Sequence, residues 1–125
     1  DEIIIRLASQ DSFRSGSAEL TANFSQLISE VAETVASSEA MRVQVEGHSD
    51  NVPIAFSDEF RSNWDLSSAR ASAVTNILLL DPALQAVRFS VVGFADTVPI
   101  ASNESAEGRA QNRRIEIKLA EFIED

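Results

Sequence analysis

Three side chains in the middle of this chain are suited to hold a small polar ligand. Asp50 and Asn63 lie in a polar stretch, and Arg70 follows in the next segment with helical periodicity. Arginine can grip a carboxylate through two parallel hydrogen bonds, and aspartate can accept hydrogen bonds from an ammonium group, so together they could clamp a zwitterion. Two plainer alternatives are that Asp50 and Arg70 pair with each other, or that Asp50 caps its own turn. Spacing alone does not decide between them.

The residues around Asp50 belong to a pattern that occurs twice. The segments VEGHSDNVPIAFS, from Val45, and VVGFADTVPIASN, from Val91, share a glycine, an aspartate and Val-Pro-Ile-Ala in the same order. Each reads as the end of a strand followed by a loop. If the two strands run parallel, both loops leave the same end of the sheet, where open α/β sheets usually bind ligands. The repeat therefore predicts a cleft between the loops, in which Asp96 of the second copy either lines the far wall or caps its turn.

Four strands and three helices are predicted to position these loops. Alternation of apolar and polar residues predicts strands over residues 2–8, 41–47, 87–93 and 113–120. A 3.6-residue period predicts helices over residues 18–35, 65–80 and 105–112. We expect Ser17 to cap the first helix and Asp65 or Asn63 the second. The expected buried stripe of the second helix consists of Leu66, Ala69, Ala73, Ile77 and Leu80.

This order predicts the fold class and a single domain. The class is α+β, a two-layer sandwich in the order βαβαβ(α)β, with a mixed four-stranded sheet and helices on one face. Residues 1–125 form one domain, in which residues 1–17 are a first strand and loop that could rearrange.

Composition excludes several classes of function. A formal net charge of −10 argues against nucleic acid as a partner. The chain has no cysteine and one histidine, which excludes disulfides, thiolate sites and two-histidine zinc sites. No apolar run is long enough to span a membrane, and we expect any anchor to lie outside this chain.

Four ordered motifs resemble a known family. VEGHSDN, SNWDLSSARASAV, VVGFADTVPIASN and EGRAQNRRIEI, preceded by FRSGSAEL, are similar to the peptidoglycan-binding domain of the OmpA-like family and cover nearly the whole chain. The long loop with its tryptophan resembles most the branch of the flagellar stator proteins MotB and PomB. Other members, in outer-membrane proteins and lipoproteins, typically have a shorter loop.

The resemblance implies a function and a set of site residues. In the family, the residues matching Asp50, Asn63 and Arg70 hold the diaminopimelate of the peptidoglycan stem peptide, which carries a free carboxylate and a free ammonium. It implies a non-catalytic periplasmic domain that anchors a motor unit to the wall, or an outer-membrane or lipoprotein tether. The implied partners are peptidoglycan, a second copy of the domain and a membrane channel subunit. The implied attachment is an inner-membrane helix that precedes this domain.

Further candidates for the site adjoin these residues. Ser49, His48 and Asn51 flank Asp50, and His48 could contact ligand, respond to acidity or be structural. Trp64 could be a packing anchor for the long loop or a platform for a sugar. Arg113 is expected to face inward with Ile115 and to meet a carboxylate or the glycan, whereas Arg114 is expected at the surface.

Other functions are weaker interpretations of the same residues. A hydrolytic set of Ser49, His48 and Asp50 is disfavoured because neighbours in an extended segment point to opposite faces. A divalent cation among His48, Asp50 and Asp96 lacks a recognisable calcium loop. We therefore predict no catalysis, cofactor or metal. A mainly dimerising structural module remains an alternative, since an edge strand could pair two copies.

Overall fold

Four strands form one mixed sheet in the computed structural model, which describes residues 2–9, 12–14, 16–40, 42–54 and 59–120. Strands β1 (Glu2–Ala8), β2 (Arg42–His48), β3 (Arg88–Gly93) and β4 (Arg114–Ala120) lie in the order β1-β4-β2-β3. β2 and β3 run parallel, and β4 is antiparallel to both β1 and β2. The helices are α1 (Ala22–Ser37), α2 (Asn63–Leu78) and α3 (Ala106–Asn112), with a short 3-10 helix, η1 (Pro82–Leu84). The predicted α+β class and element order are confirmed.

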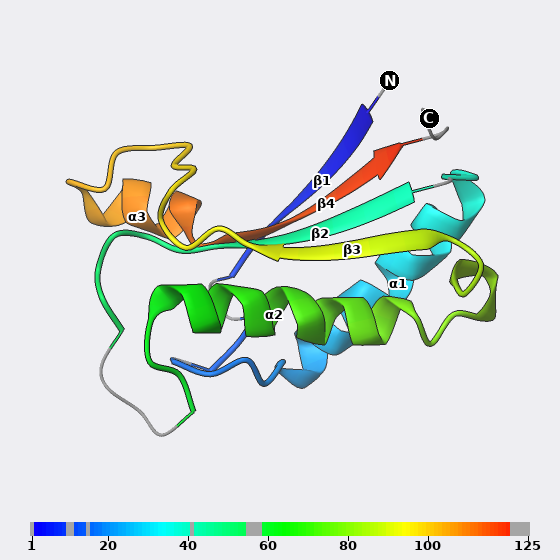
Figure 1. Cartoon of the computed structure of the whole chain (residues 1–125), viewed down its shortest axis with the longest axis horizontal. Coiled ribbons are helices and arrows are strands. Elements are labelled where there is room, and N and C mark those ends of the chain that lie inside the picture. Colours follow the sequence, from blue (N-terminus) through cyan, green and yellow to red (C-terminus); the bar gives the residue numbers. More distant parts are fainter. Residues whose placement is uncertain (1, 10–11, 15, 41, 55–58, 121–125) are drawn as a thin grey trace.

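Helices α1 and α2 cover one face of the sheet, and α3 lies beyond its end (Figure 1). The core is the layer between these two helices and the inward residues of the strands. Among the described residues, its most deeply buried members include Ile28, Val35, Val43, Val45, Val74, Leu78, Ile115 and Ile117. Burial of these aliphatic side chains is the main stabilising contribution to the fold.

The first helix begins later than predicted. Thr21, and not Ser17, is its N-cap, and the Thr21 side chain accepts a hydrogen bond from the backbone N–H of Phe24. Ser17 instead lies in a turn, because its backbone N–H donates to Arg14 O and its hydroxyl accepts from Glu19 N. The helix was predicted to begin too early because the apolar period includes Leu20. In the structure, Leu20 pairs with Phe13 in an isolated bridge and lies outside the helix.

The second helix is found, but its cap and buried face were predicted wrongly. Ser62 is the N-cap, and its side chain accepts from the backbone N–H of Asp65. Within the expected stripe Leu66 is buried, but Leu80 lies past the end of the helix and is 75% exposed. The buried residues are Leu66, Ser67, Ala71, Val74, Thr75 and Leu78. Small residues on both faces of α2 hide its true period, so the choice of stripe slipped by one position.

Close contact between α2 and the end of β2 fixes where the site residues lie. A Cβ placed on Gly47 would lie 2.0 Å from the backbone oxygen of Ser67. Only glycine lets the helix approach the strand this closely. The Ser67 hydroxyl also accepts from Ala95 N, which follows β3, and Ser49 N donates to Ala95 O. The first turns of α2 and both loops of the repeat are therefore tied together.

The face of the sheet opposite the helices carries charged side chains. Glu116 accepts hydrogen bonds from Arg6 at 3.1 Å and from Arg114 at 2.5 Å, and Glu46 pairs with Lys118 at 3.1 Å. Arg114 was predicted at the surface but is only 2% exposed. Alternation assigned it to the correct face, but that face is covered at this end, where Arg114 also donates to Val98 O and Asn112 O.

No helix within the described part of the chain has the length and apolar character needed to cross a membrane.

Candidate functional site

The Asp50 carboxylate has two partners at the end of β2. Its Oδ1 accepts from the backbone N–H of Val52 at 3.0 Å, and its Oδ2 accepts from Arg113 Nη1 at 2.6 Å. Asp50 is 7% exposed, whereas the Arg113 side chain is 37% exposed. Asp50 therefore caps its own turn, as one alternative predicted, and Arg113 meets a carboxylate as expected. The predicted pairing of Asp50 with Arg70 is wrong, because Arg113 takes that position.

The Arg70 side chain contacts the segment that precedes α1. Its Nε donates to Ser17 O at 2.8 Å and its Nη2 to Arg14 O at 3.3 Å, and its guanidinium lies 4.7 Å from the centre of the Phe13 ring. These contacts hold the group by backbone carbonyls and a cation–π contact. None of the described carboxylates forms an ion pair with Arg70.

Two guanidinium groups and one carboxylate thus share this end of the molecule. Burial, and then the positive charge of Arg113, lower the pKa of Arg70 below its ordinary value. Arginine nevertheless stays protonated at neutral pH. The described residues give Arg113 a carboxylate and Arg70 none, so the charge of Arg70 is unpaired near the Arg113–Asp50 ion pair. This set of Asp50, Arg70 and Arg113, which we call the charged corner, is suited to an anionic group with a cation next to it.

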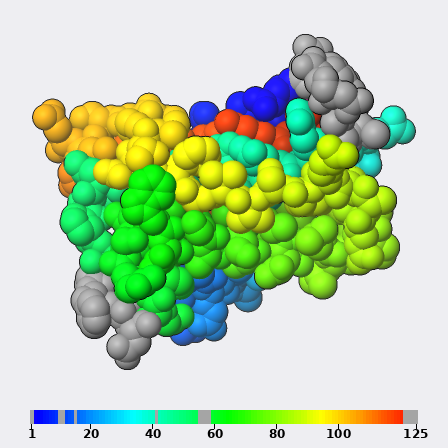
Figure 2. Space-filling view, in the orientation of Figure 1, coloured from blue at the N-terminus to red at the C-terminus, as the bar shows by residue number. Residues whose placement is uncertain are grey.

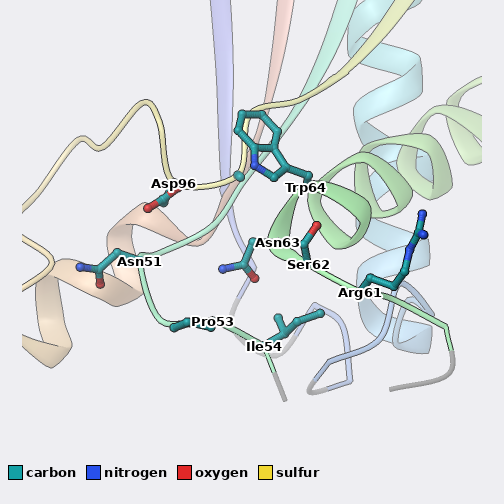
Figure 3. Close-up of a pocket in the computed structure, with 9 residues that line it drawn as sticks. Asn51, Pro53, Ile54, Arg61, Ser62, Asn63, Trp64 and Asp96 are labelled. Atoms are coloured by element: carbon teal, nitrogen blue, oxygen red, sulfur yellow. The ribbon is translucent and has the colours of Figure 1, made fainter. Parts of the chain in front are cut away.

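A pocket of about 280 Å³ is lined by the loop that follows Asp50, by the start of α2 and by the segment after β3. Figure 3 shows Trp64 and Asp96 along one side of it, Pro53 and Ile54 along the other, and Asn51 and Asn63 between them. The two VPIA loops leave the same end of the sheet, as predicted, because β2 and β3 are parallel. The segment after β3 and the first turn of α2 adjoin at that end (Figure 2). Residues 55–58 of the long loop lie outside the described residues.

The other predicted site residues surround Asp50 in different ways. Asn63 is the first residue of α2, and its Nδ2 donates to Val52 O at 3.0 Å, which holds the loop against the helix. The Ser49 hydroxyl donates to the backbone oxygen of Asp50 at 2.8 Å. Asn51 is exposed and lines the pocket. Trp64 is 52% exposed and lines the pocket together with Pro53 and Ile54, so it is not a fully buried anchor of the long loop.

His48 faces away from the charged corner. It is 4% exposed, stacks on Phe94 with ring centres 5.2 Å apart, and lies 3.1 Å from the Glu46 carboxylate. Burial, and to a lesser extent the positive charge of Arg114, lower the pKa of His48, although the hydrogen bond with Glu46 opposes this shift. The imidazole is therefore neutral at neutral pH and buried in the opposite face of the sheet.

The residues that could hold a metal ion in the structure differ from the set His48, Asp50 and Asp96 considered from the sequence. Glu46, His48 and Glu116 are the group within the described residues whose ligand atoms lie within 4.8 Å of one another. Lys118, Arg6 and Arg114 already pair with these carboxylates. A divalent cation would have to displace them, so the donor set does not favour a metal.

Two residues that organise the site were missed by the sequence analysis. Phe13, 7% exposed, supports the Arg70 guanidinium, and the FRSGS motif was the available signal for it. Asn112 is fully buried, with Oδ1 accepting from the N–H groups of Ile100 and Ala101 and Nδ2 donating to Ala101 O and Asn103 Oδ1. It fixes the second loop, and the EGRAQNRRIEI motif that contains it was the available signal.

A family model described as the OmpA family matches residues 12–113. The chain belongs to the OmpA family. The predicted resemblance to non-catalytic OmpA-like peptidoglycan-binding domains is therefore confirmed.

Individual OmpA-family relatives differ in the assemblies that their names describe. The chain is 36% identical to Motility protein B of Bacillus subtilis over 94% of its own length, and spans 44% of that protein. It is 40% identical to the cell wall anchor of the T6SS from Pseudomonas aeruginosa, with a TM-score of 0.86, covering 96% of this chain and 82% of that one. A putative MotB-like protein from Desulfovibrio vulgaris is 26% identical, also with a TM-score of 0.86, covering 98% of this chain and 75% of that one.

Proposed function

We propose that this domain is a wall anchor that binds the stem peptide of peptidoglycan without catalysis. Membership of the OmpA family supports the polymer, and the charged corner supports the part of it that is bound. The observation that carries the proposal is the unpaired positive charge of Arg70 near the ion pair of Arg113 with Asp50.

Each half of a diaminopimelate end group fits one part of this corner. Its free carboxylate would lie between the guanidinium groups of Arg70 and Arg113, which offer charge-assisted hydrogen bonds. Its ammonium would lie at Asp50, whose oxygens are held in place by Val52 N and Arg113. Asn63 fixes the loop that carries Asp50, and Ser49 orients the backbone there. His48 is buried on the far face and is a positioning residue at most.

The assembly that the domain anchors is a finer part of the proposal. The likeness to Motility protein B along most of the chain favours a flagellar stator, with a second copy, a channel subunit and an inner-membrane helix outside this sequence. Two linked domains facing many stem peptides would hold the wall far longer than one. The likeness to a T6SS cell wall anchor supports a second candidate, a wall tether of another envelope machine.

Binding to purified sacculi tests the clamp. We expect Arg70→Ala to abolish co-sedimentation with sacculi while the circular dichroism spectrum stays unchanged. Arg88→Ala is the matched control, because Arg88 is an exposed arginine at the start of β3, at the opposite end of the sheet. Sedimentation of the Arg70 variant at the wild-type level would refute the clamp.

A comparison of two wall types tests which group Arg70 recognises. Walls with lysine in place of diaminopimelate lack the extra carboxylate, so we expect weaker binding to them. Equal binding would assign recognition to the glycan and not to the stem peptide.

Deletion of the gene separates the two assemblies. Loss of swimming in soft agar with normal secretion supports the stator. Normal swimming with loss of secretion supports the other tether.

A further inference from the structure

We propose that the pocket beside Trp64 is a second subsite, which binds an uncharged sugar ring of the wall glycan. The inference rests on the proposed function, because it extends the same ligand from its peptide to its sugar. The pocket adjoins the charged corner but does not include Arg70 or Arg113 among its lining residues.

Exposure of Trp64 is the first observation. The indole lies in the first turn of α2, a rigid element, and leaves 52% of its surface exposed. A tryptophan normally contributes to stability by burying its large apolar surface, so one left half-exposed on a helix marks a contact surface. Val52 is also 52% exposed at the same end of the molecule. A flat aromatic face of this kind stacks against the C–H groups of a sugar ring.

Polar groups around the indole are the second observation. Asn51, Asn63 and Asp96 carry amide and carboxylate groups that border the pocket (Figure 3). Asn63 uses its Nδ2 on Val52 O, and within the described residues its Oδ1 and the Asp96 carboxylate have no hydrogen-bond partner. Such acceptors suit the hydroxyl and acetamido N–H donors of an amino sugar. An apolar wall with a few placed polar groups is the usual composition of a small-molecule site.

Charge distinguishes this pocket from the charged corner. Among the described lining residues, Asp96 and Arg61 are the charged ones, and they have opposite signs. Arg61 already pairs with Asp65, so the Asp96 carboxylate disfavours a bound anion, and the pocket fits an uncharged ring that offers hydrogen-bond donors. The volume of about 280 Å³ lies near the lower end of ligand pockets, roughly 300–1,000 Å³, and so suits one ring better than a longer chain.

Connectivity links the two subsites. Asp50 lies at the charged corner, and the next residues, Asn51, Pro53 and Ile54, line the pocket. One short loop thus forms a wall of both subsites. A sugar and the peptide that branches from it could therefore occupy the pocket and the corner together, which would give specificity for a sugar that bears a stem peptide.

Tryptophan fluorescence provides the direct test, because Trp64 is the only tryptophan in the chain. We expect an N-acetylglucosamine oligomer without peptide to change Trp64 emission in a saturable way. The response should persist in Arg70→Ala, a variant that we expect not to bind the free stem peptide. A Trp64 emission that is insensitive to the oligomer would overturn the subsite.

Affinities for a muropeptide and for its free stem peptide give the second test. We expect Trp64→Ala to weaken the affinity for the muropeptide about threefold to tenfold, since aromatic stacking contributes about 0.5–1.5 kcal/mol. The affinity for the free stem peptide should stay unchanged. The muropeptide affinity of Trp64→Phe should lie between those of wild type and Trp64→Ala. Asp96→Ala should also weaken binding of the muropeptide and not of the free peptide. Leu80→Ala, which removes an exposed side chain just past the far end of α2, is the control.

The two proposals fail in different ways. Equal muropeptide affinity of wild type and Trp64→Ala, with the free peptide still bound, overturns the sugar subsite and leaves the peptide clamp. A wild-type domain that responds to the oligomer but does not bind the free peptide overturns the clamp and leaves the subsite.

Discussion

The Asp50 carboxylate has a structural role in the fold and, in the proposed clamp, a second role in recognition. Its Oδ1 closes the turn to Val52, and its Oδ2 holds Arg113. A carboxylate oxygen can accept more than one hydrogen bond, so an ammonium group can approach without displacing either partner. The sequence could not separate the turn-capping interpretation from the clamp, because the proposed clamp uses the same carboxylate atoms that cap the turn.

Removing the charge of Asp50 separates its role in the turn from its proposed role in ligand binding. We expect Asp50→Asn to keep the hydrogen bond from Val52 N, to lower the free energy of unfolding by about 1 kcal/mol as the Arg113 pair is lost, and to weaken sacculus binding at least about tenfold. Sedimentation and urea unfolding measure the two effects.

Asp81→Asn is the matched control for that variant. Asp81 caps the start of η1 by accepting from Ala83 N and forms no ion pair with a described residue. Wild-type sacculus binding by Asp50→Asn would show that Asp50 is a turn residue only.

His48 gives a prediction about pH, since burial lowers its pKa. The unfolded chain binds a proton at this site near pH 6.5, and the folded domain does so only at a lower pH, so the stabilising contribution is complete above pH 6.5 and is lost as the pH falls below it. Glu46, Glu116, Arg114 and Phe94 surround the imidazole. We expect His48→Gln, which stays neutral, to lose less stability than wild type between about pH 7.5 and 5.5.

Urea unfolding at several pH values measures this difference. Carboxylates are common to both proteins, so their contribution cancels in the comparison. Parallel pH dependences for wild type and His48→Gln would contradict the assignment.

Helix α2 is the element that relates the two subsites. Its first turn carries Asn63 and Trp64, and Arg70 follows about two turns later. The presence and length of the helix were predictable from its helical period, but its N-cap and its buried face were not, because serine and alanine lie on every side of it. The close contacts of Ser67 with Gly47 and of Ser68 with Gly93 show which side meets the sheet.

A methyl group at Gly47 tests whether this contact sets the geometry of the charged corner. We expect Gly47→Ala to push α2 away from β2, to cost roughly 1–3 kcal/mol of stability, and to weaken sacculus binding beyond what unfolding explains, because Asp50 follows β2 and Arg70 belongs to α2. Binding is measured at a temperature where the variant remains folded.

Ser72→Ala is the control on the exposed side of α2. A Gly47→Ala variant that is as stable as wild type and binds sacculi normally would contradict the close-packing argument.

At the scale of the whole molecule, local patterns predicted more of the fold than of the site. The strands and the parallel repeat loops follow from periodicity and spacing, which are local properties. The contacts of Arg70 with Arg14, Ser17 and Phe13 join segments more than 50 residues apart and have no local signature. The pairing of Asp50 with Arg113 is likewise distant, and the burial of Arg114 depends on a loop folding over the sheet.

The antiparallel pairing of β1 with β4 has a mechanical consequence for an anchor. Glu2 pairs with Ala120 at one end of the sheet, and Ala8 pairs with Arg114 at the other, beside the loops that form both subsites. If the wall holds those loops and tension enters through Glu2, the pull runs along the axis of β1. The hydrogen bonds of the ladder, together with the Arg6–Glu116 ion pair, then bear the load at the same time in shear, and do not open one by one as in unzipping.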